Sequence, residues 1–128
     1  MPRFVIHEHH ATHLHWDFRL ESGGVLKSWA IPKGPSMDPA DKRLAIQVED
    51  HDLDYGRFEG TIPEGEYGAG QVTIWDQGTY EPLDDFAEGL AAGAIRFCLQ
   101  GKKLSGEFSL VRMKKGTGKE WLLIRKKD

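Results

Sequence analysis

Residues 14–20 alternate strictly between apolar and polar side chains, in the order Leu14-His15-Trp16-Asp17-Phe18-Arg19-Leu20. A period of two is typical of a β-strand with one face in the core, because successive side chains on a strand point to opposite faces. Similar short stretches recur between glycines and prolines, at residues 25–31, 43–49, 71–75, 94–99, 108–113 and 121–125. Only residues 83–92 favour a helix, which Gly89 weakens. We therefore expect an all-β fold, a small antiparallel β-barrel with about eight strands and little helix.

The length and composition of the chain exclude several other classes of protein. Its 128 residues suit one domain, residues 1–128, rather than two separate cores. Cys98 is the only cysteine, so a disulfide scaffold is excluded. No apolar run approaches the roughly 18 residues that span a bilayer, and the N-terminus lacks a signal-peptide pattern. We therefore expect a cytoplasmic protein without a membrane partner.

The net charge of −3 conceals an uneven distribution along the chain. Residues 1–95 carry a net charge of −10 and all six histidines, whereas residues 96–128 carry +7. An acidic, histidine-rich region suggests a metal site, and a basic region suggests a polyanionic partner. Neutralisation between two parts of one folded surface explains the charges equally well.

A candidate metal site lies at the start of the first predicted strand. His15, Asp17 and Arg19 share its polar face, and the alternating apolar residues should face the core. A turn at residues 10–13 would bring His9 back beside His15. Two histidines and one carboxylate, with open positions for water or substrate, suit Mn, Fe or Zn better than Ca or Mg. The alternative is an exposed strand with satisfied polar groups.

A second group of polar residues surrounds His51. The neighbouring carboxylates of the run 49–54 should raise the pKa of His51, and an imidazolium can bind a phosphate oxygen or protonate a leaving group. Arg43 and Glu49 are expected on one face of the preceding strand, opposite Leu44, Ile46 and Val48. Lys33 lies in a rigid Pro-Lys-Gly-Pro turn. The glycine-rich run 62–70 lacks the Lys-Ser/Thr of a P-loop and predicts a tight loop.

Four segments of the chain resemble the 3′-phosphoesterase module of bacterial DNA ligase D. They are FVIHEHHATHLHWDFRL at 4–20, LKSWAIPKGP at 26–35, VEDHDLDY at 48–55 and EGTIPEGEYGAG at 59–70. The resemblance extends over residues 4–128. No ligase or polymerase segment is recognised within the 128 residues, so a free-standing version of the module is expected.

This resemblance implies an enzyme that heals DNA 3′ ends. Such a phosphoesterase removes a 3′-terminal ribonucleotide and the 3′-phosphate, leaving a 3′-OH for repair or end joining. The implied cofactor is Mn²⁺, with Zn²⁺ or Co²⁺ as alternatives. By position, the metal ligands are His9, His15 and Asp17, and the scissile phosphate is held by Arg19 and His51. Further residues implied in activity are Lys33, Arg43, Glu49 and Tyr55.

The expected partners are DNA 3′ ends, including primer-template ends that carry a 3′-phosphate or a 3′-ribonucleotide. A separate DNA ligase and Ku-type end-joining proteins are further expected partners, and the protein is expected to be a monomer. His7, His10 and His13 depart from the residues common in the family, and the N-terminal arm of ligase-fused members is expected to be missing. The balance between diesterase and monoesterase activity is therefore open.

Two other classes of function fit part of the pattern. Two histidines and one carboxylate also form the site of non-haem iron oxygenases, although no anchor for a co-substrate is found. The second alternative is a module that carries the same motifs and binds DNA ends but catalyses no reaction.

Overall fold

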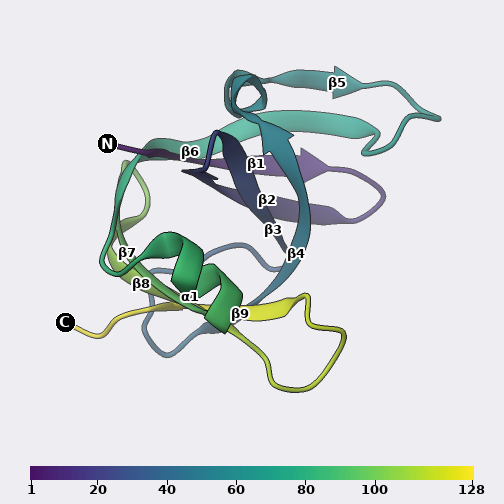
Figure 1. Ribbon diagram of the computed structural model, residues 1–128. Coiled ribbons are helices and arrows are strands. Elements are labelled where there is room, and N and C mark those ends of the chain that lie inside the picture. Colours follow the sequence, from purple (N-terminus) through teal and green to yellow (C-terminus); the bar gives the residue numbers. More distant parts are fainter.

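Eight antiparallel strands close on themselves in the computed structural model, which describes residues 1–128 (Figure 1). The strands neighbour one another in the order β1-β2-β3-β4-β9-β8-β7-β6, and pairing of β1 with β6 closes the barrel. β5 adds to the edge of β6 beyond the part that pairs with β7. The predicted all-β barrel with little helix is therefore confirmed.

The elements follow the chain in this order: β1 (Arg3–His10), β2 (Leu14–Ser22), β3 (Val25–Ile31), β4 (Lys42–Asp52), η1 (Leu53–Arg57), β5 (Gly60–Ile62), β6 (Gly70–Pro82), α1 (Phe86–Ala92), β7 (Ala94–Gly101), β8 (Ser105–Arg112) and β9 (Glu120–Arg125). Each of the seven predicted strands corresponds to one of these. β1 and β5 are additional.

The inside of the barrel is filled by apolar and aromatic side chains. Trp29 and Trp121 meet edge to face, with ring centroids 5.7 Å apart, and Phe97 stacks between Phe18 and Phe108. These five rings are fully buried. Because β1 and β2 turn Ile6 and Phe18 to this interior, their alternate side chains project from the outer face of the barrel.

The faces of two strands differ from the prediction. Leu14 starts β2 beyond the packed interior and is exposed. In β4 the core position is Ala45, which pairs with buried Trp121, so Leu44 and its alternate neighbours face outward. The apolar residues Leu44, Ile46 and Val48, which alternate along this strand, therefore do not face the core.

The one α-helix is short and begins later than predicted. The Asp85 side chain accepts a hydrogen bond from the Glu88 N–H at 2.9 Å and thereby caps the helix, which starts at Phe86 rather than residue 83. Leu90 and Phe86 pack against the barrel interior. With seven residues in its longest helix, the structure contains no helical segment able to cross a bilayer.

Asp76 is a buried carboxylate that supports the turn between β7 and β8. It accepts hydrogen bonds from the backbone N–H groups of Gln77, Lys102, Lys103 and Leu104 at 2.9, 2.9, 3.2 and 2.9 Å. Asp76→Ala leaves these donors without an acceptor, three of them in one turn. We expect the free energy of unfolding to fall by about 3 kcal/mol. Urea unfolding measures this change in the free energy of unfolding, and Asp84→Ala is the control variant.

The control removes a carboxylate that is paired with Arg96 at the solvent-exposed surface. Asp84→Ala should therefore change the stability far less than Asp76→Ala. Equal effects of the two substitutions would contradict the structural role of Asp76.

Candidate metal and phosphate site

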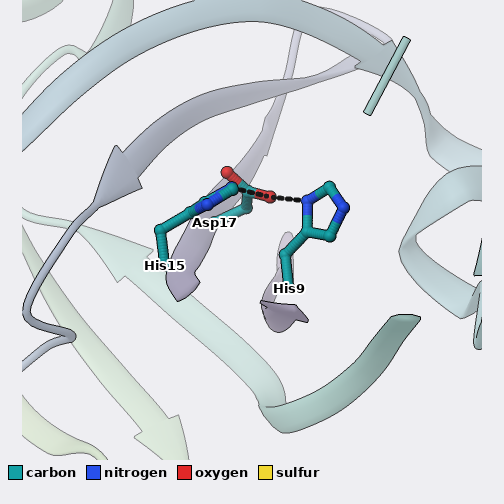
Figure 2. A group of neighbouring side chains, drawn as sticks. All are labelled: His9, His15 and Asp17. Atoms are coloured by element: carbon teal, nitrogen blue, oxygen red, sulfur yellow. Dashed lines mark ion pairs between the residues drawn. The ribbon is translucent and has the colours of Figure 1, made fainter. Parts of the chain in front are cut away.

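Three candidate metal ligands converge on the outer face of the β1–β2 hairpin. His9 pairs directly with His15 across the two strands, and Asp17 lies two residues further along β2. One ligand atom from each residue lies within 4.8 Å of the other two. Figure 2 shows the three side chains directed toward one another. The predicted turn at residues 10–13 is present and has the predicted effect of bringing the two histidines together.

Neighbouring carbonyl groups determine which nitrogen of each histidine is available. His9 Nε2 lies 2.7 Å from the carbonyl oxygen of Gly68, and His15 Nδ1 lies 3.0 Å from that of His13. A carbonyl oxygen only accepts, so these nitrogens carry the protons. His9 Nδ1 and His15 Nε2 therefore face Asp17 Oδ2, at 3.4 and 3.2 Å. In the free protein the hydrogen bond to Asp17 raises the pKa of His15, and a metal would take the place of the proton on Nε2.

This set of donor atoms fits a divalent transition metal. Two neutral imidazole nitrogens and a carboxylate oxygen suit Mn²⁺, Fe²⁺ or Zn²⁺. Burial raises the pKa of Asp17, but its hydrogen bond with His15 and the charge of Arg19 outweigh burial and lower it overall. Asp17 is therefore ionised, as a metal ligand must be. Carbonyl partners that orient ligating histidines are typical of protein metal sites.

Arg19 lies next to this cluster, and contacts with four residues fix the orientation of its guanidinium. Its Nε donates to His7 Nδ1 at 3.0 Å, and one terminal nitrogen donates to Ser28 Oγ at 2.8 Å. The other lies 3.4 Å from Asp17 Oδ2, and the guanidinium lies over the Tyr55 ring, 4.9 Å from its centroid. A guanidinium oriented in this way has little freedom to lose on binding an anion.

The 3₁₀ helix η1 covers the site and supplies Tyr55. The Tyr55 ring stacks on His51, with centroids 4.5 Å apart, and on Phe58, at 5.3 Å. His51 reaches this position through a bulge in β4: Leu26 pairs with His51 and Ser28 with Val48, so two residues of β4 stand opposite Lys27.

Seven of the nine predicted site residues line one hollow of about 320 Å³. They are His9, His15, Asp17, Arg19, Glu49, His51 and Tyr55. The other two, Lys33 and Arg43, line a separate hollow with Asp41. The expectation that Arg43 and Glu49 share a face is not met, because the bulge interrupts the alternation and Arg43 pairs with Asp41 at 3.4 Å.

The charge state of His51 also differs from the prediction. Burial, followed by the charge of Arg19, lowers the pKa of His51, and the nearby carboxylates only partly offset this. The expectation of a raised pKa is therefore wrong. One reason is that Asp50 pairs with Lys27 at 2.8 Å. In the free protein His51 is a neutral imidazole at pH 7.

Comparison with known proteins identifies the family. The model of the DNA ligase D 3′-phosphoesterase domain matches residues 7–112. The chain belongs to this family. The multifunctional non-homologous end joining protein LigD of Pseudomonas aeruginosa is 56% identical over 127 residues, which is 98% of this chain and 15% of that protein. LigD of Mycobacterium bovis is 48% identical over 125 residues, and LigD of Mycolicibacterium smegmatis 46% over 134. Each of these two alignments includes 98% of this chain and 16% or 17% of the relative.

The chain thus spans about one sixth of the length of these relatives. The family model covers residues 7–112, and the candidate metal and phosphate site lies within these matched residues. The resemblance inferred from four sequence motifs is confirmed.

Three groups in this candidate site were not predicted to take part. His7 and Ser28 hold Arg19, and the Gly68 carbonyl orients His9. His7 lies two residues before His9 on the same strand, so the period-two rule could have placed it on the same face. The sequence contains no comparable signal for Ser28 or Gly68.

His7 has to be neutral to accept the hydrogen bond from Arg19. Burial and the charge of Arg19 lower its pKa from 6.5 to about 4, and its Nε2 donates to the Phe58 carbonyl at 3.1 Å. The unfolded chain therefore binds a proton at His7 between about pH 6.5 and 4 that the folded chain does not. Its contribution to stability is complete above pH 6.5 and is lost as the pH falls towards 4.

We expect His7 to account for about 2 kcal/mol of the stability lost between pH 7 and pH 5 in metal-free protein. Replacing His7 with glutamine keeps a donor and an acceptor but removes the titration. Urea unfolding in chelator at the two pH values should show a smaller loss for His7→Gln than for wild type. The same loss in both proteins would show that His7 does not titrate in this way.

Proposed function

We propose that the protein is a Mn²⁺-dependent phosphoesterase that heals DNA 3′ ends. It removes a terminal 3′-phosphate and a 3′-terminal ribonucleotide, leaving a 3′-OH. The observation that supports this best is the convergence of His9, His15 and Asp17 beside Arg19 in one hollow of a 3′-phosphoesterase family member. Zn²⁺ and Co²⁺ are alternative ions for the same ligands.

Arg19 binds the scissile phosphate. Three hydrogen-bonding and ionic contacts already orient its guanidinium, which has five N–H donors, so donors remain for phosphate oxygens. Their positions do not have to reorganise as negative charge develops on those oxygens. Tyr55 keeps the guanidinium plane in place from the other side.

A bound metal would polarise a phosphate oxygen and lower the pKa of a coordinated water. His9 Nδ1 and His15 Nε2 would hold it, and the Gly68 and His13 carbonyls keep both rings oriented. Asp17 supplies the negative ligand. Because Asp17 also contacts Arg19, the ligand set and the phosphate-binding group are positioned together.

His51 lines the same hollow and is the candidate proton donor to the leaving oxygen. In removal of the 3′-phosphate, hydrolysis places a hydroxyl on phosphorus, breaks the bond to the 3′ oxygen and requires a proton on that oxygen. In the preceding diester step the leaving oxygen is instead the 5′ oxygen of the terminal ribonucleoside. His51 is neutral in the free protein, but a bound phosphate adds negative charge beside it and favours the imidazolium. Glu49, on the rim of the hollow, positions a water molecule.

Lys33 and Arg43 act on the DNA backbone rather than on the scissile phosphate, since they line a different hollow. Basic residues of the C-terminal third add further backbone contacts. Such contacts make binding weaken steeply with salt and provide no sequence specificity. In the cell we expect a cytoplasmic monomer that prepares DNA ends for a DNA ligase and Ku-type end-joining proteins.

The test uses a 5′-labelled primer-template that ends in a 3′-phosphate or a single 3′-ribonucleotide. Release of phosphate, and extension of the product by a polymerase, should occur with Mn²⁺ and stop with a chelator. Zn²⁺ and Co²⁺ are tested in the same way. The reaction should proceed unchanged without oxygen, because hydrolysis does not consume it.

Each alternative function gives a different result. Binding of the ends without product, with any of the three metals, would indicate a non-catalytic binding module. A reaction that stops when oxygen is removed would indicate an oxygenase.

A further inference from the structure

A second hollow adjoins the metal and phosphate site on its outer side. It measures about 460 Å³, and Val48, Glu49 and Tyr67 line both hollows. Ile46, Gln47 and Lys119 complete its lining. A molecule whose phosphate lies at Arg19 can therefore extend directly into this second hollow.

Tyr67 is the most prominent side chain at the boundary. It is 90% exposed, so packing within the protein does not explain its position. The loop that carries it is nevertheless well anchored: Ala69 N donates to the Glu66 carbonyl at 3.1 Å, and His9 Nε2 donates to the Gly68 carbonyl at 2.7 Å. Gly70 packs so closely on β1 that a Cβ there would overlap the His10 carbonyl.

Tyr67 is also the aromatic ring of the site whose faces are free. Tyr55, the other tyrosine, already stacks on His51 and Phe58. A planar ligand entering from solvent therefore meets the ring of Tyr67. Aromatic rings that stack on bases without reading their edges are typical of proteins that bind single strands.

The rest of the second hollow suits the sugar and the following phosphate of a nucleic acid. Ile46 and Val48, on the outward face of β4, provide an apolar floor. Lys119 lies on the far side, where its carbonyl accepts a hydrogen bond from the Gln47 N–H at 2.7 Å. The Lys119 side chain is exposed and forms no ion pair, so its ammonium is available to a phosphate.

We propose that the second hollow binds the terminal nucleoside of the strand whose 3′-phosphate occupies the metal and phosphate site, an assignment that rests on the function proposed above. The base stacks on Tyr67, the sugar lies against Val48, and Lys119 binds the next phosphate in the 5′ direction. The protein thus recognises a nucleoside 3′-phosphate of any base.

A third hollow, beyond η1, is the competing place for this nucleoside. It contains Leu53, and the charges of Arg3 and Arg57 are balanced there by those of Glu21 and Asp54. Its only aromatic ring is that of buried Phe4, so it offers no exposed ring on which a base could stack. Leu53→Ala therefore serves as the variant that probes this alternative.

The experiment measures binding of fluorescent single-stranded oligonucleotides in chelator, so that no reaction takes place. One oligonucleotide ends in a normal nucleoside 3′-phosphate, and the other ends in an abasic 3′-phosphate. Wild type should bind the normal end about 5- to 100-fold more tightly, as expected for one stacked base. Tyr67→Ala should abolish this preference and bind both ends as wild type binds the abasic end, whereas Tyr67→Phe should keep it.

Lys119→Ala should weaken the binding of both oligonucleotides and reduce the salt dependence of that binding. Lys102→Ala is the comparison within the same basic third of the chain: Lys102 is exposed and lines neither hollow, so its loss should weaken binding less than Lys119→Ala does. Mn²⁺ affinity, measured separately, should be the same in Tyr67→Ala and wild type, which shows that His9 is still oriented.

The proposal is overturned if Tyr67→Ala keeps the preference for the normal end, or if Leu53→Ala rather than Tyr67→Ala abolishes it. Failure of the proposed function is distinguishable from either result. In that case wild type with Mn²⁺ releases no phosphate from either end, whatever the binding measurements show.

Discussion

Asp17→Asn is expected to reduce the rate of phosphate release from a DNA 3′ end by about a thousandfold. Asp17 is the one anionic residue among the candidate ligands and also contacts Arg19 at 3.4 Å. The amide keeps the shape of the side chain but not its charge, so both metal binding and the phosphate-binding group are impaired. A loss of about 4 kcal/mol in transition-state stabilisation corresponds to this factor.

Two measurements separate this effect from loss of the fold. Mn²⁺ binding, followed by electron paramagnetic resonance, should be weakened in Asp17→Asn, while circular dichroism should show an intact barrel. His15→Ala removes a more exposed ligand and should also lose Mn²⁺ affinity and activity. His10→Ala is the control, because His10 lies on the same strand but contacts Glu8 at 2.8 Å, outside the site. Full activity in Asp17→Asn or His15→Ala would rule out the proposed ligands.

The β1–β2 hairpin shows how much of the site can be predicted from sequence. The period-two pattern of residues 14–20 placed His15, Asp17 and Arg19 on one face, because β2 has a distinct core face and site face. β1 was missed as a strand because both of its faces are buried. Ile6 faces the barrel interior and His7 faces the site, and neither is exposed to solvent. A strand of this kind does not show an alternation between buried and solvated positions.

β4 shows where pattern reasoning failed. Its apolar residues Ile46 and Val48 lie on the outward face, where both line the second hollow and Val48 also lines the first. Small Ala45 occupies the core position opposite Trp121. Alternation alone cannot tell a core face from an apolar binding face. The bulge opposite Lys27 cannot be deduced from sequence either, although it brings His51 into the site.

The pKa of His51 was mispredicted because neighbours in sequence are not neighbours in space. Carboxylates at residues 49–54 surround His51 along the chain, but an extended strand directs adjacent side chains to opposite faces. Burial and Arg19 dominate instead. Arg19 is 32 positions away in sequence, so only the strand pairing reveals its proximity.

Arg19→Lys is expected to lower kcat for phosphate release by about a hundredfold to a thousandfold, although the positive charge is retained. An ammonium cannot donate to His7 and Ser28 together while presenting further donors to a phosphate. Removal of one preoriented donor to a developing oxyanion costs about this factor. Arg96→Lys is the matched control, since Arg96 pairs with Asp84 at the exposed surface away from the site.

Mn²⁺ affinity distinguishes the role of Arg19 from that of the metal ligands. In Arg19→Lys it should remain close to that of wild type, because the three ligand residues are untouched. The effect of the substitution should instead appear in measurements with phosphate ligands. We expect a reduced kcat for the DNA end and weaker inhibition by inorganic phosphate. If phosphate inhibited the variant as strongly as wild type, Arg19 would not bind the phosphate. Its four contacts would then serve only to keep Asp17 and Tyr55 in place.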